Sequence, residues 1–372
     1  MVLKLYAPPK YEHKRGAQAP RYANIGQDCG STKYETIRMV SSIKIPNQIN
    51  RGVIVKNKKL TIALTATGLA SATLVSLFAI NKVIGKIATS KDLLNTRNKE
   101  IFNWRFGDIS YSVTGEGKPV LLIHNLKEDS SSIEWSQIIP ELSMNHTVYT
   151  IDLLGCGLSD RPDMICTSFM YTQLVSDFVR DVIKKKTNIV VTGKSAAFVL
   201  EACSNEPDLY GDLILINPDS IRNFRKAPSK RTKTAVFILK LKIIGTFIYH
   251  MMCRKKKIYN YFEEDGFYDK ENIPEALVDC YYEAAHIGGM NAKNLYTSLK
   301  GRYTNVNIVR ALKEINNNVH ILASEELPNI RKNMKEYQYH NPAVEVEYLD
   351  YVKELPQLEA PEKVLDYLKI YM

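Results

Sequence analysis

The stretch that decides the fold is Asn188-Ile-Val-Val-Thr-Gly-Lys-Ser-Ala-Ala-Phe-Val-Leu-Glu-Ala202. Its first five residues, 188–192, are apolar and mostly β-branched, which is typical of a strand covered on both faces. Residues 196–202 are good helix formers, with Phe198, Val199 and Ala202 on one side. The stretch therefore predicts a buried strand, a tight turn and a helix.

The turn of this stretch reads Gly193-Lys-Ser-Ala-Ala197, a variant of the motif G-x-S-x-G. In that motif, small residues two before and two after the serine allow a strained turn to pack between strand and helix. Here Ala197 replaces the second glycine. The pentapeptide alone does not distinguish a reactive serine from an ordinary strand-to-helix turn, so the rest of the chain has to decide.

Strands and helices alternate on both sides of this stretch. Residues 104–113 alternate between apolar and polar side chains and predict a hairpin arm. Apolar runs predict strands at 119–125, 147–152, 212–218, 318–323 and 344–349. Amphipathic patterns predict helices at 130–142, 171–186, 328–337 and 361–371. The alternation predicts an α/β fold with a mostly parallel, doubly wound sheet.

Residues 219–312 break this rhythm and predict a helical insertion. Within it, 235–252 is apolar and is followed by the four cations of 254–257. Lys240 and Lys242 argue against a second membrane span. We expect a cap helix that packs over the mouth of a site, and the alternative is a helix that lies in the interface of an anionic membrane.

The positive charge of the chain is concentrated at its N-terminus. The 372 residues carry a net charge of +10, but residues 1–59 alone hold 12 Lys/Arg against three Asp/Glu. The remaining residues are nearly balanced, with 38 basic and 37 acidic side chains. We therefore predict a mostly disordered basic arm at 1–59 beside a membrane, and no nucleic-acid-binding fold.

Residues 60–81 follow this arm and contain no charged side chain in 22 positions. A helix of that length spans roughly 33 Å, enough to cross a bilayer. We predict a single transmembrane helix, a helical or extended spacer at 82–102 and a folded domain at 103–372. A buried helix of a soluble domain and a signal peptide are the alternatives to the span. Lysines flank both ends, so the side of the membrane on which the domain lies stays open.

The six cysteines show no C-x-x-C spacing, so we expect no metal site, and no motif calls for a cofactor. Five of them lie in the predicted domain, an odd number. We expect free thiols, which slightly favours a reducing compartment.

Four stretches, in order and at their spacings, resemble the α/β-hydrolase family. They are Leu121-Leu-Ile-His-Asn125, Asp152-Leu-Leu-Gly-Cys-Gly-Leu-Ser-Asp-Arg-Pro162, the turn Gly193–Ala197, and Leu355-Pro-Gln-Leu-Glu-Ala-Pro361. The resemblance implies an α/β-hydrolase fold with the insertion 219–312 as its cap. It also implies that Ser195 stands at the nucleophile's position. The amides of Asn125 and Ala196 would then form the oxyanion hole, which binds charge developing on a carbonyl oxygen.

The sequence departs from the family at the other two members of the catalytic triad. Leu327 stands where the acid is expected and Glu354 where the histidine is expected. A carboxylate of ordinary pKa is a poor base for a serine hydroxyl. Replacements from elsewhere are Asp219 as the acid and His286 as the base, each against a capping or hydrogen-bonding role. His124 is a weaker candidate for contact with Ser195.

Two functions of different classes follow. The first is a membrane-anchored hydrolase-like protein that is atypical or inactive because it lacks the usual His and Asp. The second is an active serine esterase or lipase-like enzyme that cleaves an apolar ester or amide with Ser195 and a relocated base. The expected partners are a lipid bilayer and an apolar small-molecule ligand or ester substrate. The oligomeric state, the substrate and the true start codon stay open.

Overall fold

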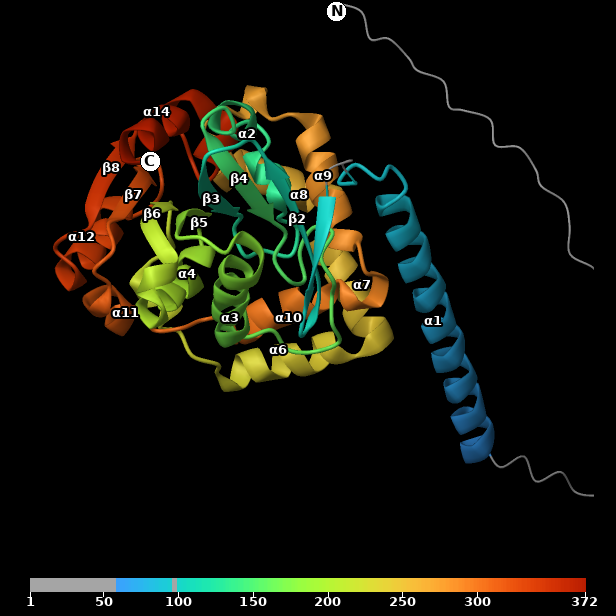
Figure 1. The fold of residues 1–372 in the computed structure, drawn as a ribbon. Coiled ribbons are helices and arrows are strands. Elements are labelled where there is room, and N and C mark those ends of the chain that lie inside the picture. The colour runs from blue at the N-terminus through green and yellow to red at the C-terminus, as the bar shows by residue number, and fades with distance from the viewer. Residues whose placement is uncertain (1–57, 96–98) are drawn as a thin grey trace, which may run out of the picture. The chain divides into compact units, whose positions relative to one another are not determined.

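The computed structural model describes residues 58–95 and 99–372, so residues 1–57 of the predicted basic arm lie outside the described residues. Within the described part, eight strands form one sheet in the order β1-β2-β4-β3-β5-β6-β7-β8 (Figure 1). The strand β2 pairs antiparallel with β1 and β4, and every other neighbouring pair is parallel. This confirms the predicted mostly parallel sheet.

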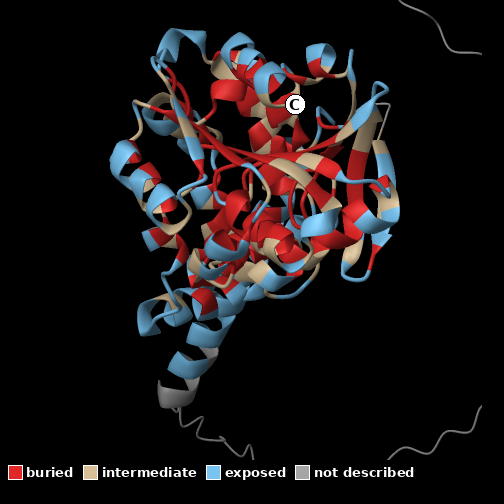
Figure 2. Cartoon of the chain, turned by 60° about the vertical axis from the view of Figure 1, so that its left-hand side comes forward, coloured by how far each residue is buried: buried red, intermediate tan, exposed pale blue. Residues whose placement is uncertain are grey.

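The strand bounds follow the predicted apolar runs closely. They are β1 (Lys99–Trp104), β2 (Gly107–Thr114), β3 (Lys118–Ile123), β4 (His146–Ile151), β5 (Thr187–Thr192), β6 (Tyr210–Ile216), β7 (Val319–Ser324) and β8 (Glu345–Leu349). The central strands are buried on both faces because helices cover both sides of the sheet, and Figure 2 shows the buried residues gathered along it.

Each face of the sheet has its own apolar core. On one face, side chains of β3, β5 and β6 pack with helices α3 (Ser168–Phe178), α4 (Ser195–Asn205), α11 (Val309–Glu314) and α12 (Ile330–His340). On the other face the cover is α2 (Ile139–Leu142) and α14 (Pro361–Tyr371). A short helix, α13 (Pro356–Glu359), precedes α14. The sheet is therefore the middle of three layers, as in doubly wound folds.

One predicted helix, 130–142, is broken in the structure. It consists of a 3-10 turn, Ser132–Trp135, and the short α2. Pro140 lies in the first turn of α2. Proline lacks an N–H and its ring clashes with the preceding turn, so one continuous helix through this position is unfavourable.

Only helices lie between β6 and β7. They are α5 (Ile221–Phe224), α6 (Lys230–Lys240), α7 (Lys242–Met252), α8 (Lys255–Tyr261), α9 (Glu275–His286), α10 (Lys293–Gly301) and α11. Helices α6 and α7 meet at a bend of 108°. We call α6 to α10 the cap, because they pack mainly on one another and on the loops at one edge of the sheet.

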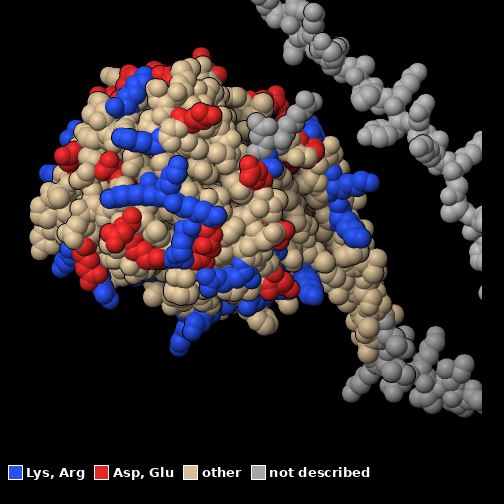
Figure 3. All heavy atoms as spheres, viewed as in Figure 1, with Lys and Arg blue, Asp and Glu red and all other residues tan. Residues whose placement is uncertain are grey.

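The helix α1 (Lys58–Ala88) is 31 residues long and extends beyond the predicted span 60–81 into the predicted spacer. Its part Thr65–Ala88 is long and apolar enough to cross a membrane, a property that core helices and signal sequences share. Hydroxyls of Thr67, Thr73 and Ser76 donate to carbonyl oxygens four residues earlier, which satisfies them inside the helix. In Figure 3 the part of α1 away from the body is an uncharged surface, and basic side chains lie where the helix meets the body.

The last turns of α1 pack on α7 and α9. The buried Asn81 donates from Nδ2 to the main-chain oxygen of Ile243 at 3.0 Å. After the helix, the main-chain N–H of Leu94 donates to Glu283 Oε1 at 3.3 Å. The end of α1 is therefore held by the cap through buried contacts.

The cysteines of the described residues are free, as predicted. Cys156, Cys166, Cys203 and Cys253 are buried and Cys280 is partly exposed. Burial raises the pKa of the Cys203 thiol to about 12, so this thiol is inert at neutral pH.

Candidate active-site cleft

A cleft of about 390 Å³ opens at the carboxyl ends of the parallel strands. Its walls come from the segments that follow β3, β5, β6, β7 and β8, together with Tyr261 of α8. Open α/β sheets bind their ligands at this edge. The residues used below that line the cleft are Asn125, Gly193, Lys194, Asp219, Leu327 and Glu354.

The turn between β5 and α4 has its left-handed corner at Gly193, where φ is +56°. Lys194 follows, and Ser195 is already the first residue of α4. A Cβ atom at Gly193 would lie 2.6 Å from Asn125 Oδ1 and 2.7 Å from Asn125 Cγ. Both the backbone conformation and the close approach therefore require glycine at the corner.

The side chain of Ser195 is fully buried. Its Oγ donates a hydrogen bond of 2.6 Å to the main-chain oxygen of His124. The His124 ring is also engaged, because Nε2 accepts from the N–H of Leu153 at 3.0 Å and Nδ1 lies 2.8 Å from the main-chain oxygen of Asn125. Burial lowers the pKa of His124, which keeps the ring neutral. His124 therefore takes no proton from Ser195 in this arrangement.

Asn125 fills the space in front of the corner. Its Oδ1 accepts from the N–H of Lys194 at 3.0 Å, and its Nδ2 donates to Glu354 Oε1 at 3.2 Å. Its own main-chain N–H donates to Glu134 Oε2 at 3.2 Å. The amide predicted to contribute to an oxyanion hole is thus bound to a carboxyl group of the protein. The N–H of Ala196, the other predicted donor, faces the main-chain oxygen of Gly193 at 3.4 Å.

Glu134 is fully buried and contacts Asn125, which lines the cleft. Besides the Asn125 N–H, its carboxyl group accepts from Thr192 Oγ1 at 3.3 Å and from Tyr281 OH at 3.1 Å. Burial without a cation raises the pKa of Glu134 to about 7. The sequence analysis did not select this residue, since a glutamate in Ser132-Ile-Glu-Trp135 carries no signal of burial. Its contacts join the ends of β3 and β5 to α9.

Glu354 and Leu327 line the cleft at the places where the resemblance expects the base and the acid of a triad. Burial raises the pKa of Glu354 above its usual value, while the charge of Lys127 acts in the opposite direction. Its carboxyl group contacts Asn125 rather than Ser195. The carboxylate at this position is therefore directed at the amide that fills the corner.

The structure does not bring Ser195, Asp219 and His286 together by hydrogen bonds. Asp219 Oδ1 accepts from the N–H of Ser220 and from Asn223 Nδ2, both at 2.7 Å, at the start of α5. His286 lines a different cavity, beside α1. No group of three His, Cys, Asp or Glu residues in the described part of the chain is placed to hold a metal ion.

Comparison with curated proteins gives partial matches. No family profile matches the chain. A 2-hydroxy-6-oxo-6-(2'-aminophenyl)hexa-2,4-dienoic acid hydrolase from Metapseudomonas resinovorans is 29% identical over 108 residues, which are 28% of this chain and 37% of that protein. An uncharacterized protein from Mycobacterium bovis is 24% identical over 140 residues, or 36% of this chain. The chain spans about 40% of the length of this mycobacterial relative.

Solved structures agree over far more of the chain. A serine hydrolase involved in carbazole degradation, the CarC enzyme, superposes with a TM-score of 0.60 at 14% identity; the match covers 73% of this chain and 97% of that chain. A membrane phospholipase A superposes with a TM-score of 0.59 at 14% identity and covers 84% of this chain and 96% of its own. Together with the strand order, these likenesses define the class: the chain has the α/β-hydrolase fold, as the sequence motifs predicted.

Proposed function

We propose that this chain is a membrane-anchored protein of α/β-hydrolase fold that does not use a serine nucleophile and serves as a binding module. The observation that carries the proposal is the left-handed corner at Gly193. In this fold the nucleophile stands on the strained strand-to-helix turn, with its Oγ exposed above the sheet. Here a residue without a side chain takes that place.

Ser195 is two residues past the corner, inside α4, and its hydroxyl is buried against a carbonyl oxygen. A serine needs access to substrate and a base within hydrogen-bond reach to act as a nucleophile. The ring of His124, whose main-chain oxygen accepts from Ser195, already uses both of its nitrogens. These contacts favour a structural role for Ser195 over the role that the sequence analysis assigned to it.

The filled corner also argues against oxyanion stabilisation. The N–H groups of Asn125 and Lys194 both have acceptors within the protein. A substrate oxygen would have to displace a carboxyl group at one and a side-chain amide at the other. Such occupied donors do not form the preorganised, vacant site that acyl transfer requires. Binding of a polar ligand in the cleft needs no such displacement.

The membrane part of the proposal rests on α1. Leu69 and Val75 are 74% and 69% exposed, in a helix that no other described element covers at that level. The bend between α6 and α7 adds exposed Phe237, Leu241 and Ile244. Ile243, in the same bend, accepts a hydrogen bond from Asn81 of α1. Uncovered apolar side chains of this extent fit a bilayer, with the bend lying in its interface.

The test is labelling with a fluorophosphonate probe, which reacts with activated serines. Wild-type protein, Ser195→Ala and Gly193→Ser are compared in membranes of the expressing cells. We expect no serine-dependent labelling of the wild type, since Ser195 lacks both exposure and a base. A catalytically competent fluorophosphonate-reactive hydrolase in the same membranes is the positive control.

Labelling of the wild type that disappears in Ser195→Ala would overturn the proposal and support the esterase alternative with a relocated base. The variant Gly193→Ser, combined with Asn125→Gly and Glu354→His, rebuilds a serine at the corner with an open hole and an imidazole. Labelling gained only by this triple variant would support the assignment of the corner to position 193.

A further inference from the structure

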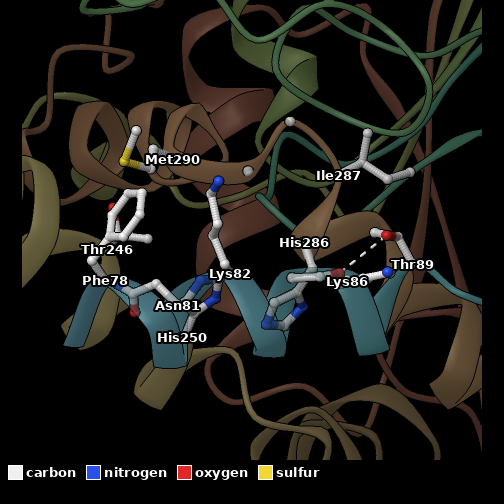
Figure 4. Close-up of a pocket in the computed structure, with 13 residues that line it drawn as sticks. Phe78, Asn81, Lys82, Lys86, Thr89, Thr246, His250, His286, Ile287 and Met290 are labelled. Carbon is white, nitrogen blue, oxygen red and sulfur yellow. Dashed lines mark hydrogen bonds between the residues drawn. The ribbon is translucent and has the colours of Figure 1, made fainter. Parts of the chain in front are cut away.

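A second cavity, of about 550 Å³, lies between α1 and the cap and shares no residue with the cleft. One wall is the last part of α1, from Phe78 to Lys86, together with Thr89 just after the helix. The opposite wall is α7 and residues 286–290 (Figure 4). Its volume is within the range of about 300–1,000 Å³ that is usual for small-molecule sites.

Much of the lining is apolar or without a side chain. Phe78, Ile287 and Met290 supply apolar surface, and Gly85 leaves open space because a Cβ there would meet no atom within 4 Å. A glycine inside a helix costs stability relative to alanine. Gly85 therefore leaves room for a ligand alongside α1.

Two buried histidines line the same cavity. The rings of His250 and His286 stack with centroids 4.9 Å apart at an angle of 4°. They are 2% and 1% exposed, yet His250 Nδ1 and His286 Nε2 have no hydrogen-bond partner among the described residues. A buried polar atom without a partner is costly, so these nitrogens indicate a missing group.

The protonation of these rings defines what that group must be. His286 Nδ1 lies 2.7 Å from the main-chain oxygen of Tyr282, which can only accept, so Nδ1 carries the proton and Nε2 offers a lone pair. Burial, with a further contribution from His286, lowers the pKa of His250 to about 4. Burial also lowers the pKa of His286 below its usual value, so both rings are neutral at pH 7, and His286 calls for a hydroxyl donor.

Lys82 and Lys86 lie one turn apart on α1 and also line the cavity. Neither forms an ion pair with a carboxylate of the described residues. Lys82 Nζ lies 5.2 Å from the centroid of the Phe78 ring, and Figure 4 shows its side chain extending from α1 toward Met290. They are the first charges after the uncharged run 60–81, so in an inserted helix they stand at the depth of lipid headgroups.

We propose that this cavity binds a single-chain lipid that carries a phosphate and a free hydroxyl, supplied by the adjacent leaflet. The chain lies against Phe78 and Met290, the hydroxyl donates to His286 Nε2, and the phosphate contacts Lys82 and Lys86. The supply from a leaflet rests on the membrane insertion of α1 proposed above.

The test measures binding of oleoyl lysophosphatidic acid to the full chain in non-ionic detergent micelles, by native mass spectrometry. Two control ligands are tested in parallel: glycerol 3-phosphate, which has only the headgroup, and oleic acid, which has only the acyl chain. We expect the lysolipid to bind and glycerol 3-phosphate not to bind. Equal binding of glycerol 3-phosphate would make this a phosphate site, and absence of lysolipid binding would overturn the proposal.

Variants locate the ligand. Lys82→Gln with Lys86→Gln should weaken binding about tenfold or more, because charge-assisted contacts to phosphate are lost. The control is Lys256→Gln with Lys257→Gln, two exposed residues of α8 outside the cavity, with the same change in charge. Equal affinities of the two double variants would refute the proposed site.

Two further variants test the cavity without changing Lys82 or Lys86. Gly85→Leu fills the open space with a good helix former and should abolish binding with no loss of thermal stability. His286→Phe keeps a ring but removes the acceptor, and should weaken binding several-fold. Unchanged binding in Gly85→Leu would place the lipid elsewhere. Extraction of the wild type from membranes by alkaline carbonate would instead refute the anchoring and leave lysolipid binding standing.

Discussion

Gly193→Ala measures how strongly the corner of the β5–α4 turn requires glycine. The substitution places a Cβ in the left-handed region, at φ +56°, and 2.6 Å from Asn125 Oδ1. An alanine in the left-handed region costs about 1–2 kcal/mol. Asn125 must also move and give up its contacts with Lys194 and Glu354, each worth about 1 kcal/mol. The expected loss is about 3–4 kcal/mol of the free energy of unfolding.

The assay is urea unfolding of the full chain in non-ionic detergent, followed by the fluorescence of Trp104 and Trp135, both buried. In a double-mutant cycle, Asn125→Ala removes the atoms that the new methyl group meets. The double variant should therefore lose less stability than the sum of the two single variants. A Gly193→Ala protein within about 0.5 kcal/mol of wild type, or strict additivity, would refute the geometry of the corner.

Two other predictions concern Glu134 and α1. Burial raises the pKa of Glu134 to about 7 from an ordinary value of 4.5, so its contribution to stability is complete below pH 4.5 and is lost as pH rises to about 7. The loss is about 3 kcal/mol of the free energy of unfolding. Melting temperatures of Glu134→Gln, measured across this pH range, should not show this part of the decline. A pH profile identical to that of the wild type would contradict the raised pKa of Glu134. Val75→Arg puts a charge on an exposed position in the middle of α1 and costs about 3 kcal/mol of insertion free energy. Alkaline carbonate should therefore extract more of this variant from membranes than of Val75→Leu. Equal release of the two variants would argue against a span.

The sheet could be predicted because its signals are local. Runs such as 188–192 and 212–218 are too short and too β-branched for helices, and each became a buried strand within a few residues of the predicted bounds. The prediction ended the span at residue 81, before the first charge, and made residues 82–102 a helical or extended spacer; α1 continues through the first part of that spacer. Lys82 and Lys86 continue the helix to Ala88, within the part of α1 that packs on α7 and α9 of the cap.

The site could not be predicted to the same degree. Gly193, Ser195 and Ala197 are all small, so the motif does not reveal which residue has the positive φ; the side chain of Asn125, 68 residues earlier in the chain, occupies that space. The stack of His250 on His286 joins two helices of the cap. In the sequence, only the small residues Ala284 and Ala285 indicated that His286 is buried, and nothing indicated that its ring stacks on His250.

The direct attachment of α1 to the cap also has a mechanical consequence. A span joined by a flexible linker would leave the domain free to rotate above the membrane, but Asn81 within α1 and Leu94 beyond its end are both hydrogen-bonded to the cap. A long apolar helix adapts to a thinner bilayer by tilting. If α1 spans a membrane, the whole domain must tilt with it, so the direction in which the cleft opens would depend on the thickness of the surrounding bilayer.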